Sequence, residues 1–165
     1  MNALVIFGRE YKPTERSAGE DVIQKKLSKL TANSKGENQA RLIKEFVADL
    51  LHSELSDIYD QVRNESKIDV FGNLDFEVAD TIDKRRHRIA KIKENRIIVK
   101  LNAVSLPRSA LKYIVAHEMA HLITKKHGKK FWKIVESIYP GFEEGQKAFM
   151  SNEKILKMPL YLSFA

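Results

Sequence analysis

Apolar residues recur every three or four positions over residues 39–64, and this period predicts a long amphipathic helix. The positions that form its apolar face are Ile43, Val47, Leu50, Leu51, Ile58 and Val62. A shorter helix is expected over residues 21–30, which carry apolar side chains along one side. The stretch between the two helices, TANSKGEN at residues 31–38, has the polar, glycine-containing composition of a linker.

The pattern changes to period two after the long helix, which predicts β-strands. Apolar and acidic residues alternate over residues 68–70 and 74–78, and a Gly-Asn pair between the two runs is a hairpin turn signal. A second strand pair is expected at residues 88–93 (RIAKIK) and 96–101 (RIIVKL). These segments predict a small antiparallel sheet in the middle of the chain.

Two further helices are expected in the C-terminal half. Ser105 and Pro107 introduce the first, which should run to about Lys126, and the second should span residues 129–139. The last residues, 151–165, include the apolar run MPLYLSF and should pack back on the body. The order of helix, strands, helix and helix predicts an α+β fold.

The linker composition also predicts a division of the chain into two parts. Residues 1–38 would form a strand followed by a flexible or partly helical segment, and residues 39–165 would form the main domain. A length of 165 residues suits one such domain with an appendage.

The overall composition excludes several classes of protein. Hydrophobic residues make up 43% of the chain and charged residues 31%, which is ordinary for a globular protein. The chain has no cysteine, so a transition metal would have to be held by histidine, aspartate or glutamate. The start, MNALVIFGRE, lacks the basic lead and long apolar core of a signal peptide, and no segment has the length of a membrane span. We therefore expect a soluble, cytoplasmic protein that makes no contact with membranes.

The sequence HEMAH, residues 117–121, lies in the first of the two C-terminal helices. His117 and His121 are one helical turn apart and about 40° apart around the axis, so both imidazoles can reach one metal ion. Zinc accepts neutral imidazole nitrogens in a tetrahedral shell, and a catalytic zinc keeps one position for water. Glu118 would take a proton from that water and pass it to the leaving nitrogen. The motif therefore predicts a zinc-dependent hydrolase.

The third ligand depends on where the helix ends. On a straight helix, His127 would lie about 9 Å beyond His121, so it can join the site only if the helix stops before it. Two lysines at residues 125–126 favour a helix C-terminus, and Gly128 permits a turn. Known zincins with a third histidine at this offset place glycine where this chain has Thr124, so here the break has to form without glycine.

A carboxylate from the next helix is the alternative third ligand. Glu136 is the first candidate, and Glu143 and Glu144 follow it. We favour His127 over these carboxylates. The two remaining histidines, His52 in the long helix and His87, are expected to be solvated.

The run HEMAHLITKKHGKKFWKIVESIYPGF, residues 117–142, resembles the YgjP-like metallopeptidases, which are relatives of the SprT-like proteases in the zincin group. The upstream stretch IIVKLNAVSLPRSALKYIVAHE is similar to the strand and proline-led helix of that family. The positions that match the family pattern are His117, Glu118, His121, His127, Phe131, Trp132 and Pro140. The resemblance implies a zincin-like fold, zinc on the three histidines and Glu118 as general base.

The chain departs from this family on the preceding strand pair. The family usually shows an Arg-Trp-Gly-Ser-Cys type motif there, whereas this chain has KRRHRIAKI at residues 84–92. The substrate preferences of the family are therefore not carried over. The likeness covers residues 97–142, and residues 1–65 show no similarity to the family that can be placed.

The basic balance of the chain has two interpretations. The net charge is +7, with a pI near 9.5, which suits either contact with nucleic acid or a solvated basic surface. KRRHR, residues 84–88, is the best local patch, although a charged turn between strands is the favoured interpretation. SprT-like proteases act on proteins attached to DNA, so a DNA-associated protease is a subordinate interpretation.

Three functions fit these observations. A zinc metallopeptidase acting on a protein or peptide is favoured. A metal-dependent endoribonuclease is the alternative, because the YbeY-like ribosomal-RNA nucleases also use three histidines at this overall spacing, although they lack the glutamate. A non-catalytic zinc-binding module is the third, and three histidines suit an open site better than a closed structural one. The donor to the oxyanion stays open among Tyr113, Tyr139 and Arg88.

Overall fold

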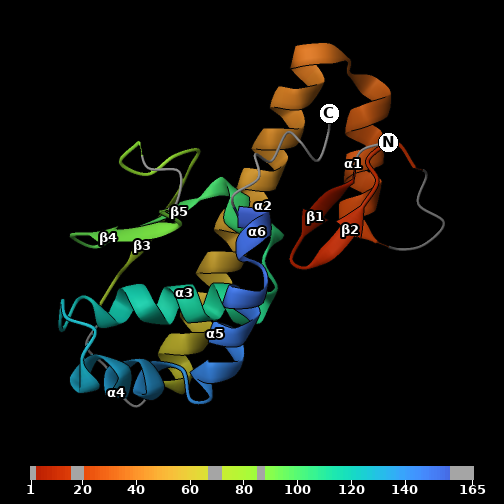
Figure 1. Ribbon diagram of the computed structural model, residues 1–165. Helices are drawn as coiled ribbons and strands as arrows, with labels where there is room; N and C mark the ends of the chain where they lie inside the picture. The colour runs from red at the N-terminus through yellow and green to blue at the C-terminus, as the bar shows by residue number, and fades with distance from the viewer. Residues whose placement is uncertain (1–2, 16–20, 67–71, 85–87, 157–165) are drawn as a thin grey trace.

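The computed structural model describes residues 3–15, 21–66, 72–84 and 88–156, and its helices and strands form a mixed α+β fold (Figure 1). The elements are β1 (Leu4–Ile6), β2 (Arg9–Tyr11), α1 (Val22–Asn33), α2 (Gly36–Glu65), β3 (Asp75–Ala79), β4 (Ala90–Lys93), β5 (Arg96–Lys100), the 3-10 helix η1 (Leu101–Ser105), α3 (Arg108–Ala120), α4 (Lys129–Ile138), α5 (Phe142–Ser151) and α6 (Glu153–Leu156). Within the described residues, every helix is too short or too polar to cross a lipid bilayer.

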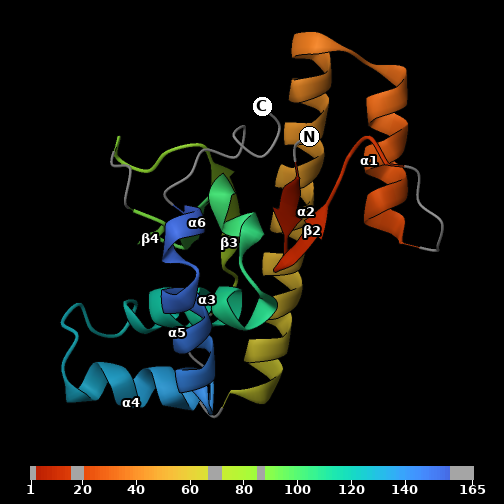
Figure 2. The same cartoon turned by 45° about the vertical axis from the view of Figure 1, so that its right-hand side comes forward.

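The long helix α2 runs along one side of the whole molecule, with α1 beside its N-terminal half (Figures 1 and 2). The prediction of an amphipathic helix here is confirmed, because one face of α2 is buried. Its buried residues are Ile43, Val47, Leu51, Leu55, Ile58, Tyr59 and Val62. This buried face follows from the three- and four-residue spacing of the sequence.

The predicted linker at residues 31–38 is wrong, since only Ser34 and Lys35 separate α1 from α2. A tight turn replaces it. Gly36 begins α2 with a φ of 59°, a conformation that glycine adopts without strain. The side-chain amide of Gln39 donates hydrogen bonds to the backbone carbonyls of Thr31 (3.0 Å) and Ser34 (2.8 Å), which satisfies groups that the end of α1 leaves free.

The three-stranded sheet has the order β3-β5-β4. The strand pair β4–β5 is antiparallel, as predicted, and its turn includes Glu94 with a positive φ. The strand β3, however, pairs with the other edge of β5 in parallel, with Phe76 opposite Ile97. The expectation of a wholly antiparallel sheet is therefore wrong. The run 68–70, expected as the hairpin partner of β3, lies outside the described residues.

Helix α3 occupies the centre of the C-terminal half. In Figures 1 and 2 it lies between the sheet on one side and α4 on the other, and α5 packs across it. Its buried residues come from all around the helix and are Ala110, Leu111, Tyr113, Ile114, Val115, Ala116, Glu118, Met119 and Ala120. A helix buried on every side is held in position by its neighbours, which suits a helix that carries a functional site.

Helix α5 is an element that the sequence does not predict. A glycine explains how it packs. A Cβ added to Gly145 would lie 2.5 Å from the backbone oxygen of Ser109, so α5 approaches α3 closely only because this position has no side chain. Beyond α5, Leu156 is buried, and its carbonyl accepts a hydrogen bond from the Asn102 amide at 3.4 Å. The tail thus begins by packing on η1, and residues 157–165 lie outside the described part.

Candidate metal centre

His117 and His121 converge at the C-terminal end of α3. His117 lies in the last turn, and His121 is the residue that caps the helix. Their Nε2 atoms are 3.3 Å apart. The HEMAH spacing therefore places both ring nitrogens at one point, as the sequence predicts.

The helix ends at Ala120, earlier than the predicted end near Lys126. The chain then tightens into a turn, in which the amides of Ile123 and Thr124 both donate to the carbonyl of Ala120 at 3.1 Å. Thr124 does not adopt a positive φ, so the turn needs no glycine there. Instead, the Thr124 carbonyl lies 3.2 Å from Nδ1 of His121. This contact fixes the tautomer that leaves Nε2 of His121 free to bind a metal.

The early end of α3 brings His127 back to the other two histidines. Its Nε2 lies 3.0 Å from Nε2 of His121, and one ligand atom from each histidine lies within 4.8 Å of the others. Among the described residues these three side chains are the only group of three that could hold a metal ion. The carboxylates of Glu136, Glu143 and Glu144 do not join it.

The geometry and chemistry of the triad fit a transition metal. Two nitrogen ligands at tetrahedral angles around zinc lie about 3.3 Å apart, close to the 3.3 and 3.0 Å seen here. Burial, followed by the charges of His121 and His127, lowers the pKa of His117 to about 4. The pKa of His121 is also lowered, chiefly by burial. Neutral imidazoles can donate their lone pairs to a metal, so these two half-buried histidines suit metal binding at neutral pH.

Aromatic side chains hold the three imidazoles in place. Phe131, the first buried residue of α4, has its ring centroid 5.0 Å from that of His117 and 4.7 Å from those of His121 and His127. Trp132 lies against His117 and His127 at 6.2 and 6.4 Å. The Phe-Trp pair therefore forms the wall behind the triad, which gives these two residues a physical role at the site. Nδ1 of His117 is buried and has no hydrogen-bond partner among the described residues.

Glu118 borders a pocket beside the triad, here named the Glu118 pocket, with a volume of about 260 Å³. Its lining residues are Arg88, Ile89, Ala90, Tyr113, Ile114, His117, Glu118 and Phe149. The Glu118 side chain is buried, and burial raises the pKa of its carboxyl to about 7, although the charge of Arg88 acts in the opposite direction. A carboxyl with a pKa near 7 can both accept and release a proton at neutral pH.

Two of the three candidate oxyanion donors line the Glu118 pocket. Tyr113 lies one turn before His117, and its pKa is raised by burial. Its hydroxyl accepts a hydrogen bond from the Gln146 amide at 3.4 Å. Arg88 forms an ion pair with Asp83 at 3.5 Å. Tyr139 is not among the lining residues and packs instead under the Lys112 ammonium, 4.6 Å from the ring centroid.

The sequence contains no signal for the contribution of α5 to this pocket. Phe149 lines the pocket, and Gln146 contacts Tyr113 beside it, because α5 packs closely on α3. Of the basic run KRRHR, Lys84 and Arg88 are described, and residues 85–87, including His87, lie outside the described part.

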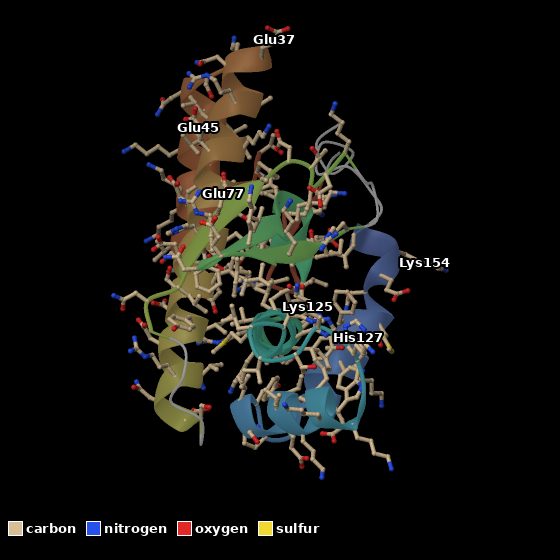
Figure 3. All side chains as sticks on the ribbon, turned by 90° about the vertical axis from the view of Figure 1, so that its left-hand side faces the viewer. Glu37, Glu45, Glu77, Lys125, His127 and Lys154 are labelled. Carbon is tan, nitrogen blue, oxygen red and sulfur yellow. The ribbon has the colours of Figure 1, made fainter. Side chains whose placement is uncertain are left out.

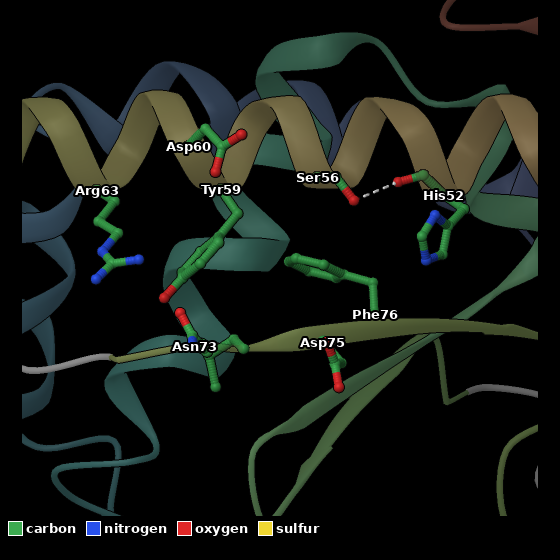
Figure 4. Close-up of a pocket in the computed structure, with 9 residues that line it drawn as sticks. His52, Ser56, Tyr59, Asp60, Arg63, Asn73, Asp75 and Phe76 are labelled. Atoms are coloured by element: carbon green, nitrogen blue, oxygen red, sulfur yellow. Dashed lines mark hydrogen bonds between the residues drawn. The ribbon is translucent and has the colours of Figure 1, made fainter.

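A separate hollow of about 370 Å³ lies between α2 and β3, and it contains His52 (Figure 4). The residues that border it include Asp60 and Arg63 of α2 and Asp75 of β3, and the rings of Tyr59 and Phe76 lie between the two elements. His52 is exposed, as expected, and it does not belong to the metal-binding group. The candidate metal chemistry is therefore confined, within the described residues, to the end of α3.

Comparison with known proteins yields a family and no individual relative. The model of the YgjP-like metallopeptidase domain matches residues 2–152. The similarity thus extends well beyond residues 97–142 and includes the N-terminal region in which the sequence showed none. No curated protein and no solved structure matches the chain. A match of this length, together with three converging histidines, shows that the chain belongs to the YgjP-like metallopeptidase family.

Proposed function

We propose that the protein is a zinc-dependent peptidase of zincin type, with His117, His121 and His127 as metal ligands and Glu118 as general base. The observation that carries the proposal is the convergence of three imidazoles beside a pocket bordered by Glu118. An all-nitrogen set without thiolates suits zinc, and three protein ligands leave one position open, as in catalytic sites. A closed structural site would need a fourth protein ligand.

The residues of the chain can then be given roles in peptide hydrolysis. Bound zinc would supply a Lewis acid and lower the pKa of water to about 7. Glu118 accepts a proton from the attacking water and donates it to the amine nitrogen as the C–N bond breaks. Tyr113 and Arg88, which line the pocket, are the candidate donors of a hydrogen bond to the oxygen of the attacked carbonyl.

The sheet supports a peptide rather than an RNA substrate. Strand β4 is an edge strand, paired only with β5 among the described elements, and Ala90 at its start lines the Glu118 pocket. A free strand edge binds an extended peptide through main-chain hydrogen bonds. An RNA backbone lacks the amide groups for such pairing. The endoribonuclease alternative shares the three histidines and explains neither Glu118 nor this edge.

The proposal is tested with Glu118→Gln, which keeps the size of the side chain and removes the base. We expect this variant to bind about one zinc per chain and to lose roughly a thousandfold or more of the peptidase activity. Glu10→Gln on β2 makes the same chemical change at an exposed position and should behave as wild type. Peptide cleavage that persists at the wild-type rate in Glu118→Gln would overturn the assignment of the base. Cleavage of RNA but not of peptides by the wild-type protein would favour the endoribonuclease.

A further inference from the structure

A dense group of lysines surrounds the third histidine. Five exposed lysines lie within nine residues of chain, and we call them the lysine rim: Lys125, Lys126, Lys129, Lys130 and Lys133. No ion pair joins any of them to a described residue. Figure 3, which looks along α3, shows Lys125 and His127 together beside the end of this helix. Positive charge is therefore concentrated in the chain on both sides of His127.

The positions of these lysines do not serve the stability of α4. Lys129 and Lys130 lie in the first turn of that helix, where no acidic residue is present. The positive end of the helix dipole disfavours cations in this turn. Exposed lysines without partners also contribute nothing through ion pairs. The lysine rim therefore requires another explanation.

A groove, here named the α4 groove, connects the lysine rim to the metal centre. It has a volume of about 520 Å³, and its lining includes His127 together with Lys129, Trp132 and Lys133 of α4. Trp132 stacks on Phe142, with ring centroids 5.6 Å apart and planes 19° apart. His117 and Glu118 border the Glu118 pocket, whereas His127 borders the α4 groove. A substrate bound across the three histidines would therefore extend from the pocket into the groove.

The charge along the α4 groove changes sign with distance from the metal centre. Lys129 is two residues from His127 in the chain, whereas Glu136 is seven residues further along α4, which is about 10 Å along the helix axis. Glu143 adds a second carboxylate to the groove. A continuous chain of phosphates would meet both carboxylates, whereas a single acidic side chain near the metal centre would meet only lysines. The groove thus favours a peptide with one local acidic residue over a nucleic acid.

We propose that the α4 groove selects peptide substrates with an acidic residue next to the scissile bond, on the side that lies over α4. Lys129 and Lys133 recognise the carboxylate of that residue. This inference rests on the proposed peptidase function and names the substrate class for the same site. The preference should weaken with added salt, because the lysines are exposed.

The test uses zinc-loaded protein and internally quenched peptides with one cleavable bond, in which Glu, Gln or Lys is placed at each position near that bond. Wild-type protein should cleave the Glu peptide about fivefold faster than the Gln peptide at one or two positions on one side only, as expected for one or two exposed ion pairs. Lys129→Glu/Lys133→Glu should reverse the preference toward Lys. Equal rates for all three residues, or a preference that survives the double substitution, would overturn the inference.

Lys26→Glu/Lys29→Glu provides the matched control. Both residues are exposed on α1, far from the groove in the fold, and the double substitution changes the net charge by the same amount. It should keep the wild-type preference. Loss of the preference in this control as well would show that net charge alone sets it, against the inference.

A binding measurement separates failure of this inference from failure of the proposed function. Fluorescence polarisation with labelled Glu, Gln and Lys peptides on the zinc-loaded Glu118→Gln variant reports recognition without cleavage. If wild-type protein cleaves none of the peptides while this variant still prefers Glu, the peptidase function fails and the groove assignment stands. If Lys129→Glu/Lys133→Glu weakens binding of a 20-nucleotide single-stranded DNA and leaves peptide preference unchanged, the lysine rim is a nucleic-acid surface and the inference is wrong.

Discussion

Helices α2 and α3 both carry histidine beside a hollow, and their surroundings differ. Helix α2 buries one stripe and leaves His52 exposed above a polar hollow, whereas α3 is buried on almost every side. At the end of α3, burial changes the pKa of both His117 and Glu118. The imidazoles there also converge against an aromatic wall. The comparison shows that enclosure, more than the presence of histidine, turns side chains into candidate ligands and a candidate base.

The largest difference between the two helices should appear in metal content. His121→Ala removes one of three converging ligands and should lower the zinc content from about one per chain to near zero, with loss of peptidase activity. His52→Ala on α2 should keep the wild-type zinc content and the wild-type peptidase activity. Elemental analysis after dialysis against a weak chelator gives the comparison. Equal zinc content in the two variants would show that the histidines of α3 are not the ligands.

The aromatic wall should matter more to stability than a comparable side chain on α2. Phe131 is fully buried against all three imidazoles, whereas Phe46 on α2 is only partly buried. Phe131→Ala should lower the free energy of unfolding of the metal-free protein by about 3–5 kcal/mol, and Phe46→Ala should lower it by less. Urea unfolding followed by circular dichroism measures both. A smaller loss for Phe131→Ala than for Phe46→Ala would contradict the central position of this ring.

The buried carboxyl of α3 makes the metal-free protein sensitive to pH. Glu118 has a pKa of about 7 in the folded protein, against an ordinary value of 4.5 in the unfolded chain. Below pH 4.5 both states hold the proton. Between pH 4.5 and 7 only the unfolded chain releases it, so stability falls as the pH rises and levels off above pH 7. The loss is up to about 3 kcal/mol.

Subtracting the unfolding free energy of Glu118→Gln from that of the wild type isolates the effect of the Glu118 carboxyl. The lowered pKa of His117 acts in the opposite sense, because it reduces stability as the pH falls below 6.5, but this contribution is present in both proteins and cancels. The difference in unfolding free energy between wild type and Glu118→Gln should therefore change steadily from pH 4.5 to 7 in chelator-treated samples. A difference that is constant with pH would contradict the burial of an ionisable Glu118.

The smallest effect is expected from the polar hollow of α2. Tyr59 donates a hydrogen bond from its hydroxyl to the Gly72 carbonyl at 2.6 Å, and its ring lies 5.9 Å from that of Phe76. Tyr59→Phe keeps the ring contact and removes the hydrogen bond, so it should cost about 1 kcal/mol and leave zinc binding and activity unchanged. Thermal unfolding and a zinc titration measure the two quantities. Loss of zinc binding in this variant would contradict the prediction, because it would show that the hollow of α2 is coupled to the metal centre.

The parts of the fold that the sequence predicts well are those with local signals. Apolar periodicity predicts α2, and alternation of apolar and acidic residues predicts β3, because each pattern follows from which face of the element is buried. The parallel pairing of β3 with β5 depends on the path of the chain between them, which periodicity does not encode. Helix α5 depends on a contact between elements, since Gly145 permits close approach to Ser109, and local sequence does not encode such a contact.

The candidate site also has one part that local sequence predicts and one part that it does not. The HEMAH spacing predicts the convergence of His117 and His121, since helix geometry alone determines it. The position of His127 depends on a turn whose key contact is made by the backbone carbonyl of Thr124, and any residue can supply a carbonyl. The side chain at position 124 therefore carries no signal for this turn, and the turn does not require glycine there.

The central claim is that three histidines at the end of α3 hold one zinc ion. Anomalous diffraction from crystals of the zinc-loaded protein, recorded on both sides of the zinc absorption edge, tests it directly. We expect one strong peak, about 2.0–2.1 Å from Nε2 of His117, His121 and His127, with the fourth coordination position of the zinc facing the Glu118 pocket. A peak bound by Glu136 in place of His127, or no peak at the three histidines, would contradict it.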